Sequence, residues 1–431
     1  MRLDVFSRRR HLAGNHPTSM AALLGLALAA APAAWLGVGC TEDACEGGCV
    51  PGVGAGTTAS GTVSATGGGG TGGVGAAGGT VDGGPDAPPP VAYSFAVFGD
   101  NQFATTSCTS GVPERLAVPE AVRVLAPTFL LHTGDLMDHG YEDGAYAQLV
   151  SCYSDMLAEV PFFPTPGNHD MGSGGISAYQ TFLEEQLFTR NASVWSGDYD
   201  ADVVIAYEDD PNDYSTDFSN PTHLDVVPSG VSFETFYAMR FENALFLSFE
   251  QGTRWWSNTP KSWLETHLSA AQSDPSVEHV FVMMHHPLYS CHMAESASGE
   301  CLLPVRTAYE TLFRDYDVTI AFAGHTHLYD RFYVPDDGTP TRQDPPPSSY
   351  PHDGQGVHYL VTGGAGPLPS GCSPPPAPRQ ELSYDYLQTR RCGHHVTEVE
   401  VLGGKLTVRI IGVDGSASDY TTEQWDEFTI E

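Results

Sequence analysis

Gly-Asn-His-Asp at residues 167–170 and Gly-His-Thr-His at residues 324–327 are the most informative stretches of this chain. Each follows a short apolar run that is typical of a buried β-strand, at residues 161–165 and 318–323. Three other apolar runs end in the same manner, in polar clusters that begin at Gly99, Gly134 and His285. Five predicted strands therefore lead directly into Asp, Asn, Gln and His side chains.

Helical patterns alternate with the predicted strands. We expect helices at residues 112–125, 144–159, 177–188, 261–272 and 304–316. We expect the other strands at residues 93–98, 128–132, 233–240, 244–250, 279–284, 357–362, 396–402 and 405–413. This alternation favours an α/β domain. Because α/β sheets bind ligands beyond the carboxyl ends of their strands, the five polar clusters are predicted to converge in space.

The clusters supply carboxylate, amide and imidazole groups and no thiolate. A mixed oxygen and nitrogen donor set suits Fe, Mn, Zn or Co. It argues against a Ca²⁺ or Mg²⁺ site, which uses oxygen ligands. The sequence therefore predicts a transition-metal site built from distant segments.

The ordered series of clusters resembles the calcineurin-like metallophosphoesterases. Their pattern is Asp-x-His, Gly-Asp-x-x-Asp, Gly-Asn-His-Asp/Glu, a lone His and Gly-His-x-His, and the resemblance covers about residues 92–333. It implies a four-layer α-β-β-α sandwich with two mixed sheets packed face to face. It also implies hydrolysis of a phosphate ester by a metal-bound hydroxide at a dinuclear centre.

The resemblance also assigns roles to individual residues. The first metal would be held by Asp100, Gln102, Asp135 and His327. Asp135 would bridge to a second metal, completed by Asn168, His285 and His325. His169 would stabilise the transition state or protonate the leaving oxygen, and Asp170 would orient His169 through a hydrogen bond. The metal pair stays open among Fe, Mn and Zn.

Two positions depart from the pattern of the family. Gln102 stands where most members have His, and an amide oxygen is a weaker ligand. Residues 285–290 and 324–331 are similar to the purple acid phosphatase branch, but its iron-binding Tyr falls at Asp138. We therefore expect no tyrosinate–iron colour, and we expect Asp138 to lie outside the ligand set.

Two further residues are candidates for substrate binding. His286 is next to His285 and is expected either to line the site or to pack in the core. Arg331 is the cation closest to the last cluster. It is expected to bind a phosphate oxygen or to form a structural ion pair.

The chain has 431 residues, 19 basic and 53 acidic side chains, and a net charge of −34. Such a surface repels duplex nucleic acid, whose binding needs clustered Lys and Arg. A small phosphate ester remains a suitable substrate, because charge repulsion from the rest of the protein is screened beyond about 8 Å at physiological salt.

The N-terminus is predicted to be an export signal, at residues 1–39. Three arginines precede an apolar run at residues 20–39. Leu36-Gly37-Val38-Gly39-Cys40 resembles a bacterial lipobox, in which Cys40 is lipidated. An uncleaved anchor is the alternative. The predicted location is the outside of a bacterial membrane, periplasmic or on the surface. Thr41 favours the outer membrane.

Two further segments complete the expected organisation. Residues 40–90, rich in Gly, Ser, Thr and Pro, are predicted to be a flexible tether, and residues 91–431 to form the phosphoesterase domain. Eight cysteines besides Cys40 suggest disulfides in an oxidising compartment. By proximity the expected pairs are Cys45–Cys49, Cys108–Cys152, Cys291–Cys301 and Cys372–Cys392.

The favoured function is a phosphomonoesterase. A phosphodiesterase acting on cyclic nucleotides or glycerophosphodiesters is an alternative, and a non-catalytic surface lipoprotein that binds a ligand is another. The complete Asn168-His169-Asp170 cluster argues for catalysis, because a binding module has little use for His169. The oligomeric state stays open.

Overall fold

The computed structural model describes residues 90–142, 144–171, 175–183, 187, 189–196, 204–206, 236–249, 258–290, 295–296, 301–352, 354–369 and 385–431. The predicted export signal, Cys40 and nearly all of the predicted tether lie outside these residues. No helix in the described part of the chain is long and apolar enough to cross a membrane.

The described chain forms two large mixed sheets. The first has the strand order β12-β17-β16-β15-β1-β2-β3. Its strands are β1 (Ala92–Phe98), β2 (Phe129–His132), β3 (Phe162–Pro164), β12 (Ser349–Tyr350), β15 (His395–Leu402), β16 (Lys405–Ser416) and β17 (Asp419–Ile430). Strands β1, β2 and β3 run parallel, so their carboxyl ends lie at one edge.

The second sheet has the strand order β14-β11-β13-β10-β7-β6-β5-β4. Its strands are β4 (Val204–Ala206), β5 (Phe236–Phe241), β6 (Ala244–Phe249), β7 (His279–Met283), β10 (Ile320–Ala323), β11 (Tyr329–Pro335), β13 (Gly356–Thr362) and β14 (Leu387–Arg391). Strands β6, β7, β10 and β13 are parallel. The short strands β8 (Glu295–Ser296) and β9 (Cys301–Leu302) pair separately.

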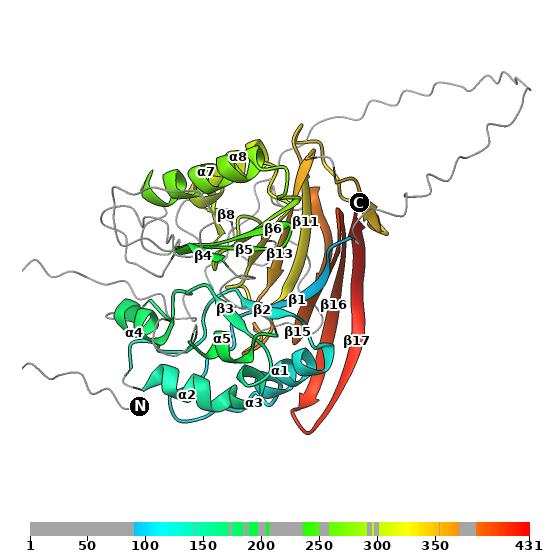
Figure 1. Cartoon of the computed structure of the whole chain (residues 1–431). Coiled ribbons are helices and arrows are strands. Elements are labelled where there is room, and N and C mark those ends of the chain that lie inside the picture. Colours follow the sequence, from blue (N-terminus) through cyan, green and yellow to red (C-terminus); the bar gives the residue numbers. More distant parts are fainter. Residues whose placement is uncertain are drawn as a thin grey trace, which may run out of the picture. The chain divides into compact units, whose positions relative to one another are not determined.

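Helices cover the outer face of each sheet (Figure 1). The helices are α1 (Glu114–Leu125), α2 (Ala145–Cys152), α3 (Ser154–Leu157), α4 (Gly175–Thr181), α5 (Thr189–Val194), α7 (Asn258–Ser273) and α8 (Leu303–Asp315). Apolar residues of α1, α2 and α3 share a buried cluster with the outward side chains of β1 and β2. Residues of α7 and α8 share another with the second sheet. The expected four-layer α-β-β-α architecture is confirmed.

The two sheets pack against each other through an aromatic core. Phe95 on β1 points inward and lies 5.3 Å from Phe246 and 5.1 Å from Phe281, measured between ring centroids. Its neighbours Ala96 and Phe98 point outward to the helices, as the two-residue period of a strand requires. Each fully buried Phe stabilises the fold by about 1.5–3 kcal/mol. This packing fixes the two sets of strand ends relative to each other.

The structure confirms one predicted disulfide and leaves the others open. Cys108 and Cys152 are bonded, with 5.4 Å between their Cα atoms, which joins the loop after β1 to the end of α2. Cys392 is disulfide-bonded, but its predicted partner Cys372 lies outside the described residues. Cys291, Cys45 and Cys49 also lie outside the described residues.

Three elements differ from the prediction for reasons that lie outside their own local sequence. The helix expected at residues 144–159 is divided into α2 and α3, because Tyr153 leaves helical geometry at φ −99° and ψ 15°. Strand β11 directly follows the Gly-His-Thr-His cluster and was not predicted. Strand β17 was also missed, since much of its sequence is polar and exposed.

Candidate metal centre

The five polar clusters converge at the carboxyl ends of the parallel strands. One group of potential metal-binding atoms comes from Asp135, His285 and His325, and a second from Asp100, Asp135 and His327. Within each group the atoms lie within 4.8 Å of one another, and Asp135 belongs to both. The Asp100, Asp135 and His285 side chains are almost completely buried. The structure thus brings together residues that are up to 227 positions apart in the chain.

The backbone at these residues is strained. Nine non-glycine residues of the described chain have positive φ angles. Five of them are predicted ligands: Asp100 (62°), Gln102 (44°), Asp135 (56°), His325 (71°) and His327 (51°). Such conformations cost about 1–3 kcal/mol each and gather at functional sites. Strain of this size persists at one place only where the surrounding fold holds the residues there.

Glycines allow the backbone to approach the two carboxylates. Gly134 has a φ of 97°, and a Cβ atom there would lie 2.8 Å from the His285 ring. A Cβ at Gly167 would collide with the Asp135 carboxylate, and one at Gly324 with that of Asp100. The glycines next to the polar clusters are therefore required by close packing.

His285 is held in one orientation by a backbone carbonyl. Its Nδ1 lies 2.9 Å from the Thr133 carbonyl oxygen, so Nδ1 donates a hydrogen bond and Nε2 faces the cluster. Nε2 lies 2.9 Å from Asn168 Oδ1 and 3.3 Å from Asp135 Oδ2. His325 Nδ1 lies 3.2 Å from the same Nε2. These four residues form one half of the site.

The other half is built around Asp100. Its carboxylate accepts the His325 backbone N–H at 2.8 Å, and its Oδ1 lies 3.4 Å from His327 Nε2. His327 Nδ1 donates to the Pro367 carbonyl at 2.5 Å, which again leaves Nε2 facing inward. Gln102 donates its amide to Asp135 Oδ2 at 3.2 Å. A half-turn of this amide would present its oxygen instead.

The donor set fits a pair of transition-metal cations. It combines two carboxylates, two amides and three imidazoles, with Asp135 shared between both halves. A carboxylate between two cations reduces their mutual repulsion. In His285 and His327, Nδ1 donates a hydrogen bond to a backbone carbonyl, as is usual for metal-binding histidines.

The carboxylates and imidazoles shift one another's pKa values. Burial alone would lower the pKa of His285, but Asp135 raises it to about 10. Burial would raise the pKa of Asp135, but His285 and His169 lower it well below its usual range. The pKa of His327 is raised, against the effect of burial, by Asp100. In the metal-free site, the carboxylates therefore favour protonated His285 and His327. Metal binding would release these protons.

His169 lies at the exposed side of the cluster. Its Nδ1 donates to the Asp138 carbonyl oxygen at 2.7 Å, so Nε2 is left for proton transfer and lies 4.0 Å from Asp135 Oδ2. Burial opposes the charged form, but Asp135 and Asp138 raise the pKa of His169. About a third of its side chain is exposed, in contrast to the buried cluster.

The predicted hydrogen bond from Asp170 to His169 is wrong. Asp170 accepts the backbone N–H groups of Leu136, Met137 and Gly167 at 3.1, 3.2 and 2.9 Å. It thereby ties the loop after β2 to the loop after β3. Asp138 orients His169 instead. Burial and the nearby Asp135 raise the pKa of Asp170 to about 7.

The two predicted substrate-binding residues have different environments. The His286 ring lies 4.3 Å from the His325 ring, so His286 borders the cluster. Arg331 is 1% exposed, and its Nε pairs with Asp426 on β17 at 2.8 Å. Its guanidinium also lies 4.4 Å from the centre of the Phe428 ring. The prediction that Arg331 binds substrate is wrong, because this cation forms a structural ion pair between the sheets.

The contacts of a supporting pair beneath the site, His132 and Asn101, were not predicted from the sequence. His132 Nδ1 accepts the Gly134 backbone N–H at 3.1 Å, and its Nε2 lies 2.6 Å from Asn101 Oδ1. Asn101 donates in turn to the Leu136 carbonyl at 2.6 Å. The pair joins the loops that carry Asp100 and Asp135. Burial lowers the pKa of His132 to about 3, so it stays neutral.

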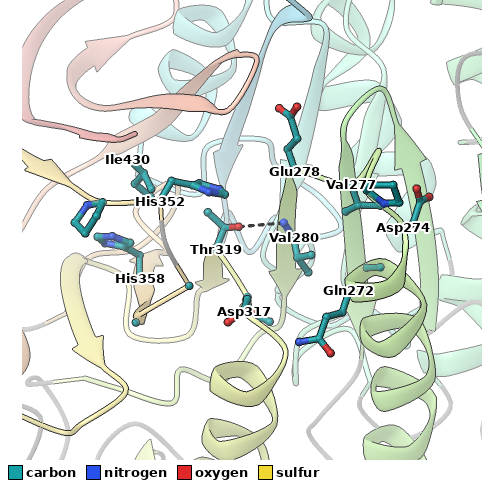
Figure 2. A pocket seen from close by; sticks show the side chains of 16 residues that line it. Gln272, Asp274, Val277, Glu278, Val280, Asp317, Thr319, His352, His358 and Ile430 are labelled. Atoms are coloured by element: carbon teal, nitrogen blue, oxygen red, sulfur yellow. Dashed lines mark hydrogen bonds between the residues drawn. The ribbon is translucent and has the colours of Figure 1, made fainter.

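A cavity of about 300 Å³ lies elsewhere, at the amino ends of β7, β10 and β13 (Figure 2). It is bordered by Asp274, Glu278, Asp317, His352 and His358. Among the described residues, no group of three potential metal-binding side chains is present there. We therefore place the functional site at the carboxyl ends of the strands.

The sequence and the structure are similar to known phosphatases. The chain is 31% identical over 106 residues to a phosphoenolpyruvate phosphatase of Allium cepa, covering 24% of this chain and 21% of that protein. It is 30% identical over 115 residues to Fe(3+)-Zn(2+) purple acid phosphatase 12 of Arabidopsis thaliana, covering 26% of this chain and 24% of the relative. The matched segment thus spans only about a quarter of these relatives.

A solved structure extends the likeness of the fold. The purple acid phosphatase PPD1 from yellow lupin, Lupinus luteus, superposes with a TM-score of 0.52 at 15% identity, covering 79% of this chain and 54% of that one. The sequence profile of the calcineurin-like phosphoesterases matches residues 93–329, more than half of the chain. That segment carries all five polar clusters of the site. The chain belongs to the calcineurin-like phosphoesterase family.

Proposed function

We propose that this protein is a metal-dependent hydrolase of phosphate esters, and specifically a phosphomonoesterase with a dinuclear centre. The observation that supports it most is the strained backbone at five donor residues, among them the shared Asp135. Such strain has no use in a core that only packs. The phosphatase names of the relatives favour a monoester over a diester.

The chain's residues would hold two cations. The first would bind Asp100, Gln102, Asp135 and His327, and the second Asp135, Asn168, His285 and His325. When bound, the cations would lower the pKa of the attacking water and neutralise charge on the phosphate. The glycines at the strand ends let the backbone come close to these side chains.

His169 would supply the leaving oxygen with a proton. Its Nδ1 is occupied by the Asp138 carbonyl, so the proton must come from Nε2. In the metal-free protein, Asp135 and Asp138 raise the pKa of His169 against the effect of burial, and in the loaded protein the Asp138 carboxylate, 3.5 Å from Nδ1, still favours the protonated ring. As water attacks phosphorus and the ester P–O bond breaks, the proton from Nε2 passes to the departing alkoxide. Asp170 keeps the two loops in register and does not take part in this transfer.

The test compares protein stripped of metal by a chelator with protein reloaded with Mn²⁺ or Zn²⁺. Release of phosphate from p-nitrophenyl phosphate and hydrolysis of bis-p-nitrophenyl phosphate are measured. We expect activity only after reloading, with kcat/KM higher for the monoester. Faster hydrolysis of the diester would favour a phosphodiesterase. No turnover of either ester would remove the proposed function.

We also propose that export and lipidation at Cys40 anchor the protein to a membrane, with residues 40–90 as the tether. The lipobox-like stretch that ends at Cys40 supports this. A Cys40→Ala variant expressed in a bacterial host should move from the membrane fraction to the soluble fraction. Unchanged membrane association would contradict lipidation.

A further inference from the structure

One aromatic side chain lies exposed beside the candidate centre. In the described part of the chain, the exposed large hydrophobic side chains are Val124, Tyr141 and Leu402, and Tyr141 is 45% exposed. Tyr141 belongs to residues 138–142, which we name the rim loop. Its ring packs edge-to-face against His139, with 5.4 Å between ring centroids.

The rim loop is directly connected to His169. The Gly140 N–H donates to the His169 carbonyl at 3.1 Å, and Asp138 O receives the His169 Nδ1–H. The Asp138 carboxylate lies 3.5 Å from His169 Nδ1 and 3.2 Å from His139 Nδ1. His169, Asp138, His139 and Tyr141 are each a third to a half exposed, and they form a continuous strip. The strip leads from the buried donors to solvent.

The rim loop is ordered by its own hydrogen bonds. The Glu142 N–H donates to the His139 carbonyl at 3.0 Å, which closes a turn. The Glu142 carboxylate accepts from Thr105 Oγ1 at 2.8 Å, which joins the rim loop to the loop after β1. The Asp138 N–H donates to Phe103 O at 3.0 Å. The aromatic pair is therefore held in place before any ligand arrives, which reduces the entropic cost of binding.

We propose that Tyr141 and His139 select substrates whose leaving group carries a flat aromatic ring and no second anionic group. This rests on the proposed function. If Nε2 of His169 protonates the leaving oxygen, the leaving group must lie on the side of His169, where the rim loop is. Exposed aromatic rings at that point provide a surface for another ring. The carboxylates of Asp138 and Glu142 repel a leaving group with a further negative charge.

The test uses two esters with primary alcohol leaving groups of similar size, benzyl phosphate and cyclohexylmethyl phosphate. With metal-loaded protein, we expect a preference for the benzyl ester. Tyr141→Ala should lower kcat/KM for benzyl phosphate about 2- to 12-fold, the factor that matches an aromatic pair. The cyclohexylmethyl ester should change less, and Tyr141→Phe should stay close to wild type. Leu402→Ala, at the exposed end of β15, is the matched control and should change neither.

Binding of the two corresponding phosphonates, measured by calorimetry, provides a readout without turnover. Loss of the benzyl preference in Tyr141→Ala, both in turnover and in binding, supports the proposal. An unchanged benzyl preference in a folded Tyr141→Ala protein that hydrolyses both esters overturns it and leaves the proposed function standing. If wild type hydrolyses neither of these esters nor p-nitrophenyl phosphate, the proposed function fails. Equal phosphonate affinities in wild type and Tyr141→Ala would then also overturn the role of the rim loop.

Discussion

The two ends of the parallel strands β7, β10 and β13 carry similar residue types in very different arrangements. At the amino ends, a cavity is bordered by three carboxylates and two imidazoles (Figure 2). His279, at the start of β7, contacts His352 at 3.1 Å and the Gly403 carbonyl at 2.8 Å. At the carboxyl ends, His285 faces Asp135, Asn168 and His325 together.

The pKa values of the two histidines differ accordingly. Burial lowers the pKa of both, but only His285 lies beside a buried carboxylate. The pKa of His279 falls to about 4, whereas Asp135 raises that of His285 to about 10. A metal site therefore depends on donors that converge on one point, and residue type alone does not make one. That convergence requires a strained backbone at the carboxyl ends, which destabilises the fold locally.

The largest effect is expected from Asp135→Asn. Loss of the shared carboxylate charge should reduce metal content and lower kcat/KM by more than the loss of a general acid does, that is by more than about 10⁴-fold. Metal analysis and phosphate release on the same preparation would check this. Asp317→Asn at the amino ends is the control and should leave both unchanged. Full metal occupancy in the Asp135 variant would contradict the bridging role.

His169→Ala should separate chemistry from metal binding. We expect kcat to fall about 10²–10⁴-fold, the range for loss of a general acid, while metal content stays the same. His352→Ala at the other end should keep full activity. A His169 variant with wild-type kcat would remove this residue from the mechanism.

His132→Phe tests the support beneath the site. The change removes the bonds to Asn101 and Gly134 but keeps a ring in the buried space. Metal affinity should weaken about 10–100-fold, as for other outer-shell partners. Competition with a coloured chelator would measure it. An unchanged dissociation constant would show that the loops hold their positions without this pair.

The smallest effect is expected at the amino ends, from the titration of His279 in metal-free protein. Its folded pKa of about 4 lies below the unfolded value, so its stabilising contribution is present above pH 6.5 and is lost as pH falls towards 4. Between pH 6.5 and 5.5 the free energy of unfolding should fall by about 1 kcal/mol from this group. Urea unfolding of His279→Gln should show a shallower loss, and equal slopes would contradict the shift.

The strand ends and their convergence followed from local patterns in the sequence. Apolar runs that end at Gly next to Asp, Asn or His marked the carboxyl ends of β1, β2, β3 and β10. The strand order of the sheets then brings these ends together. Side-chain partners across the fold were not predictable in this way. Arg331 pairs with Asp426, 95 residues later, and Asp170 bonds backbone groups of a different loop. Strand β17 was hidden because its pairing partner, not its own apolar pattern, makes it a strand.

The dinuclear centre can be tested with crystals of the protein soaked with Mn²⁺ and measured for anomalous scattering. We expect two peaks about 3.5–4 Å apart, on either side of the Asp135 carboxylate. One peak should lie against Asp100 and His327, and the other against His285 and His325. A single peak, or manganese bound away from Asp135 in crystals that take up the ion, would contradict a dinuclear centre at these strand ends.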